Sequence, residues 1–260
     1  MGLINKKIKS KSCRKLLHNA LDFSHHASKK ISLKLYGTRL KEHKPRKIVS
    51  EKYKFIYIEN PLSASQSVLN SIYRKGKRKY QTYSTRNWCN ISKDKIDNYK
   101  KFTVKRNPWE RVVSCYNKKI LNALSPARIA IIAQFDGLYP QMSFGKFIEW
   151  LCSGEGSDGN ANKHWVSQYK IIYEESPMPP DVVIELKNFE YQYRQVFEEV
   201  GAPIPKIYDK GASKDQYIKT PFENKKKYYN SLSSERFEKI ENRYKKDCKM
   251  LGYPRLADWV

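Results

Sequence analysis

The chain of 260 residues carries 51 lysines and arginines against 26 aspartates and glutamates, a net charge of +25. Its length allows a substantial core in one large or two small domains, and its 13% aromatic content argues against a chain disordered throughout. No apolar run approaches the roughly 20 residues of a membrane span, and the excess positive charge indicates an anionic partner such as nucleic acid, acidic glycan or a phosphorylated cofactor.

Cysteine and histidine spacing disfavours metal chemistry. The five cysteines are far apart without a CxxC pair, and the five histidines show no spacing such as HExxH. The sequence therefore predicts neither a disulfide framework nor a metal site. Residues 1–14 are basic with no hydrophobic segment after them, which is atypical of a secretory signal, so a cytoplasmic location is expected.

The chain divides into a basic N-terminal arm or flanking helix over 1–50 and a folded domain over 51–260. The first strong strand signal is 54–58, which ends near the breaker Asn60-Pro61. A loop of small residues over 63–67 then leads into a helical pattern over 68–73.

The same order of strand, loop and helix recurs further along the chain. Asn107 is a good N-cap with Pro108 at the first helical position, and Gly201 is a typical helix stop. The remaining expected elements are a strand at 102–104, a helix at 109–120, an irregular region at 121–180, a strand at 181–186, a helix at 189–200 and a charged helix at 231–252.

Strands that alternate with helices predict an α/β fold with a mainly parallel sheet flanked by helices. Ligands of such sheets collect at the carboxyl ends of the strands, where helix N-termini attract anions. We therefore expect the strand ends near Pro61 and Arg106 to converge on one pocket.

The loop that follows the first strand suits a phosphate group. Its small residues let the backbone approach closely, and its side chains donate hydrogen bonds. It lacks the glycines and the GK[ST] ending of a Walker loop, which argues against an ATPase or nucleotide kinase. The candidate ligands are Pro61, Ser63, Ala64, Ser65, Gln66 and Ser67.

The segment Arg106–Tyr116, RNPWERVVSCY, is more specific. Arg106 leaves the strand at the rim of the expected site, where a planar guanidinium can clamp phosphate oxygens. Arg111 and Ser114 lie three residues apart on one helix face. All three are candidate phosphate ligands.

Together, these two segments resemble the nucleotide-binding motifs of the sulfotransferases that use PAPS (3′-phosphoadenosine-5′-phosphosulfate), especially the carbohydrate (Golgi-type) group and its bacterial relatives. Pro61–Ser67, PLSASQS, is similar to the family's P-K-x-x-x-(T/S)-S loop, which binds the 5′-phosphosulfate. Arg106–Tyr116 is similar to its R-N-P-(Y/W)-(D/E)-R-x-x-S-x-Y motif, which grips the 3′-phosphate. Three further segments agree in order: His164–Gln168 (HWVSQ), Val183–Phe189 (VIELKNF) and Asp247 with Leu251–Tyr253.

The resemblance implies a P-loop-NTPase-like parallel sheet, PAPS as co-substrate without a metal, and Arg106 and Ser114 as the 3′-phosphate ligands. The loop lysine of the family is Leu62 here, and Lys105 is the nearest substitute cation in the motifs, with Lys54 less favoured. An acceptor also needs a general base within hydrogen-bond reach. Glu59 at the end of the first strand is the first candidate and His164 the second.

The expected function is transfer of the sulfuryl group of PAPS to a hydroxyl or amine. The expected acceptor is a carbohydrate, with an acidic glycan among the candidates, or a small molecule. Two alternatives stay open: a non-catalytic PAPS- or PAP-binding relative, because of Leu62, and a basic nucleic-acid-binding protein, because of the charge. The second does not explain the ordered motifs, so no specific nucleic-acid partner is expected.

Overall fold

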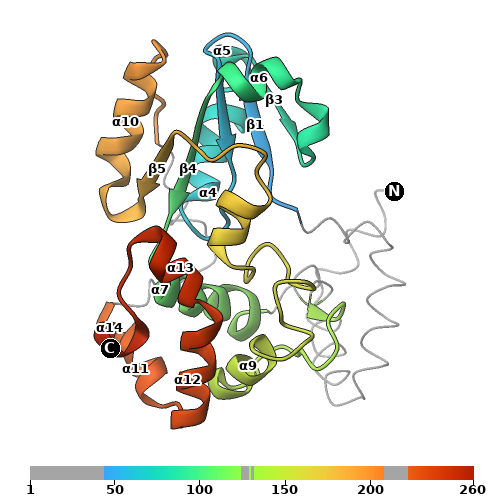
Figure 1. Cartoon of the computed structure of the whole chain (residues 1–260), viewed down its shortest axis with the longest axis vertical. Coiled ribbons are helices and arrows are strands. Elements are labelled where there is room, and N and C mark those ends of the chain that lie inside the picture. Colours follow the sequence, from blue (N-terminus) through green and yellow to red (C-terminus); the bar gives the residue numbers. More distant parts are fainter. Residues whose placement is uncertain (1–43, 124–128, 130–131, 208–221) are drawn as a thin grey trace, which may run out of the picture.

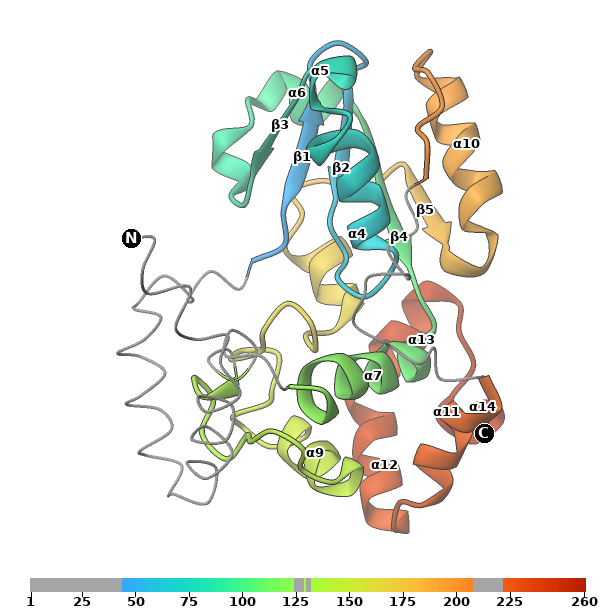
Figure 2. The same ribbon diagram turned by 180° about the vertical axis from the view of Figure 1, so that it is seen from behind.

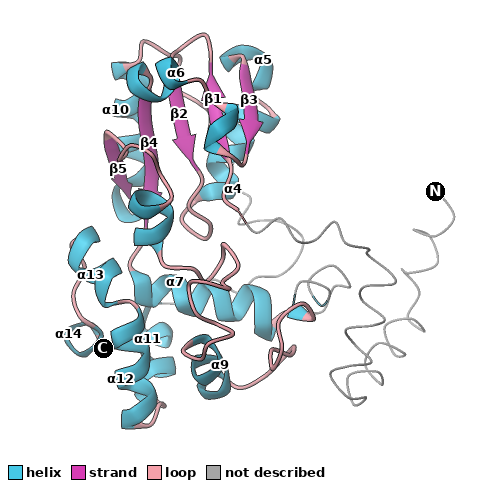
Figure 3. Ribbon diagram, turned by 45° about the vertical axis from the view of Figure 1, so that its right-hand side comes forward, coloured by secondary structure: helices cyan, strands magenta, loops and turns pink. Residues whose placement is uncertain are grey.

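The structure, a computed structural model, describes residues 44–123, 129, 132–207 and 222–260. A five-stranded sheet forms one part of the fold. The second part, called the helical part below, contains the helices within residues 108–151 and 222–260 and lies beyond the C-terminal ends of β2 and β4 (Figures 1 and 3). The strands are β1 (Lys47–Ser50), β2 (Phe55–Ile58), β3 (Thr82–Thr85), β4 (Lys100–Lys105) and β5 (Val182–Glu185), in the order β3-β1-β2-β4-β5.

The helices of the described residues include several short π and 3₁₀ turns. In chain order they are α4 (Ser65–Val68), η2 (Leu69–Arg74), α5 (Lys77–Tyr80), η3 (Trp88–Asn90), α6 (Lys93–Asn98), α7 (Pro108–Cys115), η4 (Tyr116–Leu121), α9 (Phe144–Leu151), η5 (Lys170–Glu174), η6 (Leu186–Asn188), α10 (Phe189–Glu199), α11 (Phe222–Asn230), α12 (Ser234–Arg243), α13 (Lys245–Leu251) and α14 (Leu256–Trp259).

The α/β class is confirmed, and the strands expected at 54–58, 102–104 and 181–186 are β2, β4 and β5. These three strands pair in parallel, but β1 runs antiparallel to both β2 and β3. The expected parallel sheet is therefore a mixed one. The reason is the short turn over 51–54, because a connection of this length joins neighbouring strands only as a hairpin.

The sheet begins before residue 51, the expected start of the folded domain. β1 lies within the range 1–50, which was expected to form a basic arm or a flanking helix, and all four of its residues are buried. Residues 1–43, the rest of that range, lie outside the described residues.

The two faces of the sheet are covered by different segments. Phe55, Tyr57, Phe102 and Val104 pack on one face against a cluster that includes residues of α4, η2 and α10, and α4 lies in front of the sheet in Figure 2. Ile58 faces the other side, where its cluster includes residues of η5 and α13. Residues of η5 and α13, which are far from β2 in the sequence, therefore pack together at the C-terminal end of β2.

The helical part has its own core, centred on Trp109 at the start of α7. Its Nε1 donates to the Pro254 carbonyl (3.1 Å), and its ring meets those of Tyr229 and Tyr244 edge-on. The single helix expected at 231–252 is divided into α12 and α13, which meet at Tyr244. No helix among the described residues is long and apolar enough to cross a membrane.

Candidate functional site

The ends of β2 and β4 converge, as the sequence predicts. Asn60, which follows β2, donates from Nδ2 to the Val104 carbonyl of β4 (2.9 Å) and to Oε1 of Gln168 (2.8 Å). The same Gln168 oxygen accepts from the Arg106 backbone N–H (3.0 Å), and Gln168 Nε2 donates to the Arg106 carbonyl (2.7 Å). One buried side chain therefore joins both turns of the expected site.

The loop after β2 is held in an uncommon backbone conformation. Leu62 (φ 70°) and Ala64 (φ 52°) both lie in the left-handed region without being glycine. Such positions cost of order 1–3 kcal/mol each and cluster at ligand-binding sites. Ser63 between them is fully buried and donates to Gln168 Oε1 (3.4 Å), so the loop is fixed from beneath.

The helix after β4 begins as expected. The Asn107 side chain accepts from the backbone N–H groups of Trp109 (3.0 Å) and Glu110 (3.3 Å), with Pro108 in the first turn. This N-cap fixes the direction of α7 directly after Arg106. Ser114 lies on α7 one turn beyond Glu110, on the same side of the helix.

The Arg106 side chain is mostly buried, with 13% of its surface exposed. Nη1 donates to the Leu62 carbonyl (3.0 Å) and Nη2 to Glu110 (3.2 Å), which also pairs with Lys225 (2.8 Å). Burial lowers the pKa of Arg106, and the Glu110 charge opposes that shift. Within the described residues, neither Arg106 Nε nor the buried Tyr253 hydroxyl has a hydrogen-bond partner. Two buried donors without acceptors fit an anionic ligand.

Arg111 lies beneath the loop. It is 2% exposed, and its guanidinium donates to three backbone carbonyls: Nε to Pro61 (3.0 Å), Nη1 to Val166 (2.7 Å) and Nη2 to Lys163 (3.2 Å). These contacts tie the loop after β2 to the segment 163–168. Arg111 is among the phosphate ligands expected from the sequence, whereas all its described hydrogen bonds go to backbone carbonyls.

The two candidate bases sit on these same segments. Glu59 is buried, and its carboxylate accepts from the Arg46 backbone N–H (2.8 Å) and from Lys163 Nζ (3.1 and 3.3 Å). His164 Nδ1 and its backbone N–H both contact Asn162 Oδ1. Because an amide oxygen only accepts, Nδ1 carries the proton in the neutral ring and Nε2 is the basic nitrogen.

Lys105 lies on the other face of the sheet from α4. Its Nζ donates to the Leu251 carbonyl (2.6 Å) and lies 5.0 Å from the centre of the Tyr253 ring. Lys54 is at the opposite end of β2, where its carbonyl accepts from Lys100 at the start of β4. The loop residue Gln66 contacts Arg74 of η2 (3.2 Å).

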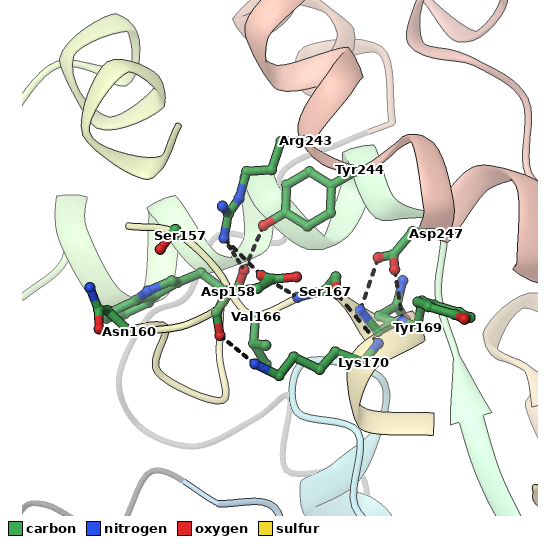
Figure 4. Close-up of polar contacts among 12 residues, drawn as sticks. Ser157, Asp158, Asn160, Val166, Ser167, Tyr169, Lys170, Arg243, Tyr244 and Asp247 are labelled. Atoms are coloured by element: carbon green, nitrogen blue, oxygen red, sulfur yellow. Dashed lines mark hydrogen bonds and ion pairs between the residues drawn. The ribbon is translucent and has the colours of Figure 1, made fainter. Parts of the chain in front are cut away.

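A polar network holds the segment 163–170 against the helical part (Figure 4). The buried Asp247 carboxylate accepts from the backbone N–H groups of Gln168 (3.0 Å) and Tyr169 (2.8 Å). Burial raises the pKa of Asp247, although these two hydrogen bonds oppose the shift. Asp158 accepts from the Ser167 N–H (3.0 Å) and pairs with Arg243 (3.0 Å), which fixes the other end of the segment.

The burial of Lys47, at the edge of the site, makes the free energy of unfolding depend on pH. It is 4% exposed, and its Nζ donates to the Arg86 carbonyl (2.9 Å). Burial lowers its pKa from 10.5 to about 8, with Glu175 and Glu59 opposing and Lys44 reinforcing the shift.

We expect the wild-type chain to gain stability relative to Lys47→Met as the pH rises from about 8 to 10.5. The unfolded chain binds more protons than the folded chain in this window, so the cost of burying the ammonium is fully present below it and is relieved across it. The gain is about 3 kcal/mol, because the pKa falls from 10.5 to about 8 and each pKa unit corresponds to about 1.36 kcal/mol. Urea unfolding at each pH measures it, and a constant difference between the two proteins would contradict it.

The described residues contain no group of three or more His, Cys, Asp and Glu side chains arranged to hold a metal ion. The comparisons with known proteins identify the class. A family model for the sulfotransferase family matches residues 45–254, and no curated protein and no solved structure matches significantly. The chain belongs to the sulfotransferase family, whose members generally use PAPS as the sulfate donor. The family resemblance drawn from the two loop motifs is thereby confirmed.

Several residues of this site were not among the predicted site residues. Gln168, Asp247 and Tyr253 lie in segments that resemble the family, but sequence alone gave them no role. Lys163 precedes one of those segments and carried no signal, because its pairing with Glu59 depends on contacts between residues 104 positions apart.

Proposed function

We propose that this chain binds PAPS and transfers its sulfuryl group to a hydroxyl or amine, with a carbohydrate as the acceptor class. The observation that carries the proposal is the junction of the loop Pro61–Ser67 with Arg106 through Gln168. It brings a strained, small-residue loop and a partly unsatisfied buried guanidinium to the same sheet edge. These are the two elements needed to recognise a nucleotide through two separated phosphates.

The residues present fit such a ligand. Arg106 and Tyr253 offer buried donors without partners, and Ser114 lies on the adjoining helix; we assign these three to the 3′-phosphate. We assign the 5′ end to the loop, through its backbone N–H groups and the side chains of Ser63, Ser65, Gln66 and Ser67. Arg111 supports the loop from beneath through the Pro61 carbonyl.

PAPS supplies an activated sulfuryl group, and the chain's task is to position it, to neutralise charge and to accept a proton. We assign the role of proton acceptor to the carboxylate of Glu59, which is two residues before Pro61 in the sequence. The Nε2 nitrogen of His164 is the second candidate. An acidic glycan would suit the positive charge of the chain (+25), and a small alcohol or amine is the other acceptor class. The cytoplasmic location stays a prediction.

The sharpest test is a thermal-shift titration with PAP beside ATP and AMP. We expect selective stabilisation by PAP, about 2.7 kcal/mol at 100 times its dissociation constant. Arg106→Ala should weaken PAP binding about 30-fold, because it removes charged hydrogen bonds worth about 2 kcal/mol. Arg78→Ala, an exposed arginine of α5, is the matched control. Equal shifts with all three nucleotides would instead favour non-specific attraction to a basic protein.

A non-catalytic PAP-binding protein is the second candidate, and Leu62 favours it. The Leu62 side chain packs against the apolar cluster that contains Trp109. The loop therefore has no cation at the position where the family places its lysine. Transfer of labelled sulfate from PAPS to a panel of carbohydrate acceptors separates the two candidates, since only an enzyme releases PAP in step with acceptor sulfation.

A further inference from the structure

The loop after β2 contains no positive charge of its own. No lysine or arginine occurs from Asn60 to Ser67, and Leu62 directs its side chain to the apolar core of the helical part. Sulfuryl transfer leaves negative charge on the 5′-phosphate of the nucleotide, so a cation is needed beside the loop.

The cations suggested by sequence are held elsewhere. Lys105 Nζ donates to the Leu251 carbonyl, and Leu251 packs with Ile58 on the sheet face opposite α4. Lys54 lies at the far end of β2, and the guanidinium of Arg111 donates to three backbone carbonyls.

Lys163 is next to the loop through two independent contacts. Its carbonyl and the Pro61 carbonyl accept hydrogen bonds from the same Arg111 guanidinium, which brings the two backbones together. Its Nζ lies 3.1 Å from the carboxylate of Glu59, the residue directly after β2. The Arg111 and Glu59 contacts therefore place both the backbone and the ammonium of Lys163 beside the entry to the loop.

The Lys163–Glu59 ion pair is largely shielded from water. The two side chains are 14% and 3% exposed. Burial lowers the pKa of Lys163, and the Glu59 charge opposes the shift. A lysine has a long stem and three rotatable donors, so its ammonium can contact a second anion without a change in the backbone.

We propose that Lys163 supplies the positive charge that position 62 of the loop lacks, by contacting the 5′-phosphate end of the bound nucleotide. The inference rests on the proposed function. In the transfer, the acceptor oxygen bonds to sulfur while the bond from sulfur to the bridging oxygen breaks. The electron pair of that bond stays on the 5′-phosphate beside Lys163, and the proton of the acceptor goes to the general base. When Lys163 contacts the 5′-phosphate, Glu59 is also released from its ion pair with Lys163.

The test compares PAP with adenosine 3′-monophosphate, which lacks the 5′-phosphate. Lys163→Met should weaken PAP binding about 10–30-fold, the cost of one charged hydrogen bond, and change 3′-monophosphate binding by less than about twofold. Lys163→Arg keeps the charge and should recover most of the PAP affinity. Lys100→Met removes a paired lysine at the opposite end of β4 and should leave the affinities for both nucleotides unchanged.

A second measurement needs no variant. Acylation of lysines in the wild-type chain, followed by mass spectrometry, should slow at Lys163 with PAP but not with adenosine 3′-monophosphate, and Lys100 should react equally throughout. Equal PAP affinity in wild type and Lys163→Met, or equal protection by both nucleotides, would overturn the role of Lys163 alone. A wild-type chain that binds PAP no better than AMP would overturn the proposed function itself.

Discussion

Replacement of Arg111 by alanine will lower the free energy of unfolding by about 3–5 kcal/mol, because buried polar groups left without partners cost about 1–3 kcal/mol each. The variant removes the donors to the Pro61, Val166 and Lys163 carbonyls together, and two of these three hydrogen bonds are fully buried. It also removes a positive charge that lowers the pKa of the buried Asp247. Urea unfolding followed by circular dichroism measures the loss.

Two further variants separate this role from a general effect of charge. Arg111→Lys keeps the charge but not the planar fork, so it should recover only part of the lost stability. Arg236→Ala breaks a surface ion pair with Glu149, in which the two side chains are 35% and 49% exposed. It should lower the free energy of unfolding by less than about 1 kcal/mol. If Arg111→Ala were no less stable than Arg236→Ala, Arg111 would not tie the loop to the segment 163–168.

Local sequence patterns predicted the parts of the site that depend on local structure. The N-cap Asn107 depends only on the backbone N–H groups two and three residues further along the chain. The small-residue loop that leads into α4 follows directly from its composition. The strands β1 (KIVS) and β3 (TYST) were missed because they contain two and one hydrophobic residues, against four in β2 (FIYI) and three in β5 (VVIE), so their strand signal is weak. Helix α9 was also missed, although Phe144, Phe147, Ile148 and Leu151 repeat at helical spacing inside a region interpreted as irregular.

The long-range contacts could not be predicted in this way. Arg111 and Ser114 share a helix, and their sequence spacing suggested the same ligand role for both. In the structure Arg111 is buried against backbone carbonyls, and this depends on where residues 61 and 163–166 lie in space. The same holds for Lys163, since nothing in its sequence neighbours indicates that Glu59 is its partner.

Gln168 hydrogen-bonds to both turns of the site, and Gln168→Leu should weaken PAP binding about 100-fold, or about 2.7 kcal/mol. Leucine is of similar size but leaves the N–H and the carbonyl of Arg106 without partners, and it removes the bond from Asn60. The turns after β2 and β4 then keep only their direct contacts, such as those of Asn60 with Val104 and of Arg106 with Leu62, so the separation of the 3′ and 5′ subsites is less firmly fixed. Isothermal titration with PAP measures the loss.

A matched variant tests the chemistry rather than the volume. Gln168→Glu keeps the oxygen that accepts from Asn60 and Arg106, but places a second oxygen where Nε2 donates to the Arg106 carbonyl. The ionised carboxylate repels that carbonyl, whereas the protonated form again supplies a donor, so PAP binding by Gln168→Glu should recover as the pH falls from 8 to 5. Gln168→Leu should show no such recovery. Gln192→Leu, which removes an acceptor for the Glu185 N–H, should leave PAP affinity unchanged. PAP affinity that is insensitive to both Gln168 variants would mean that the direct contacts between the two turns suffice to fix the site without Gln168.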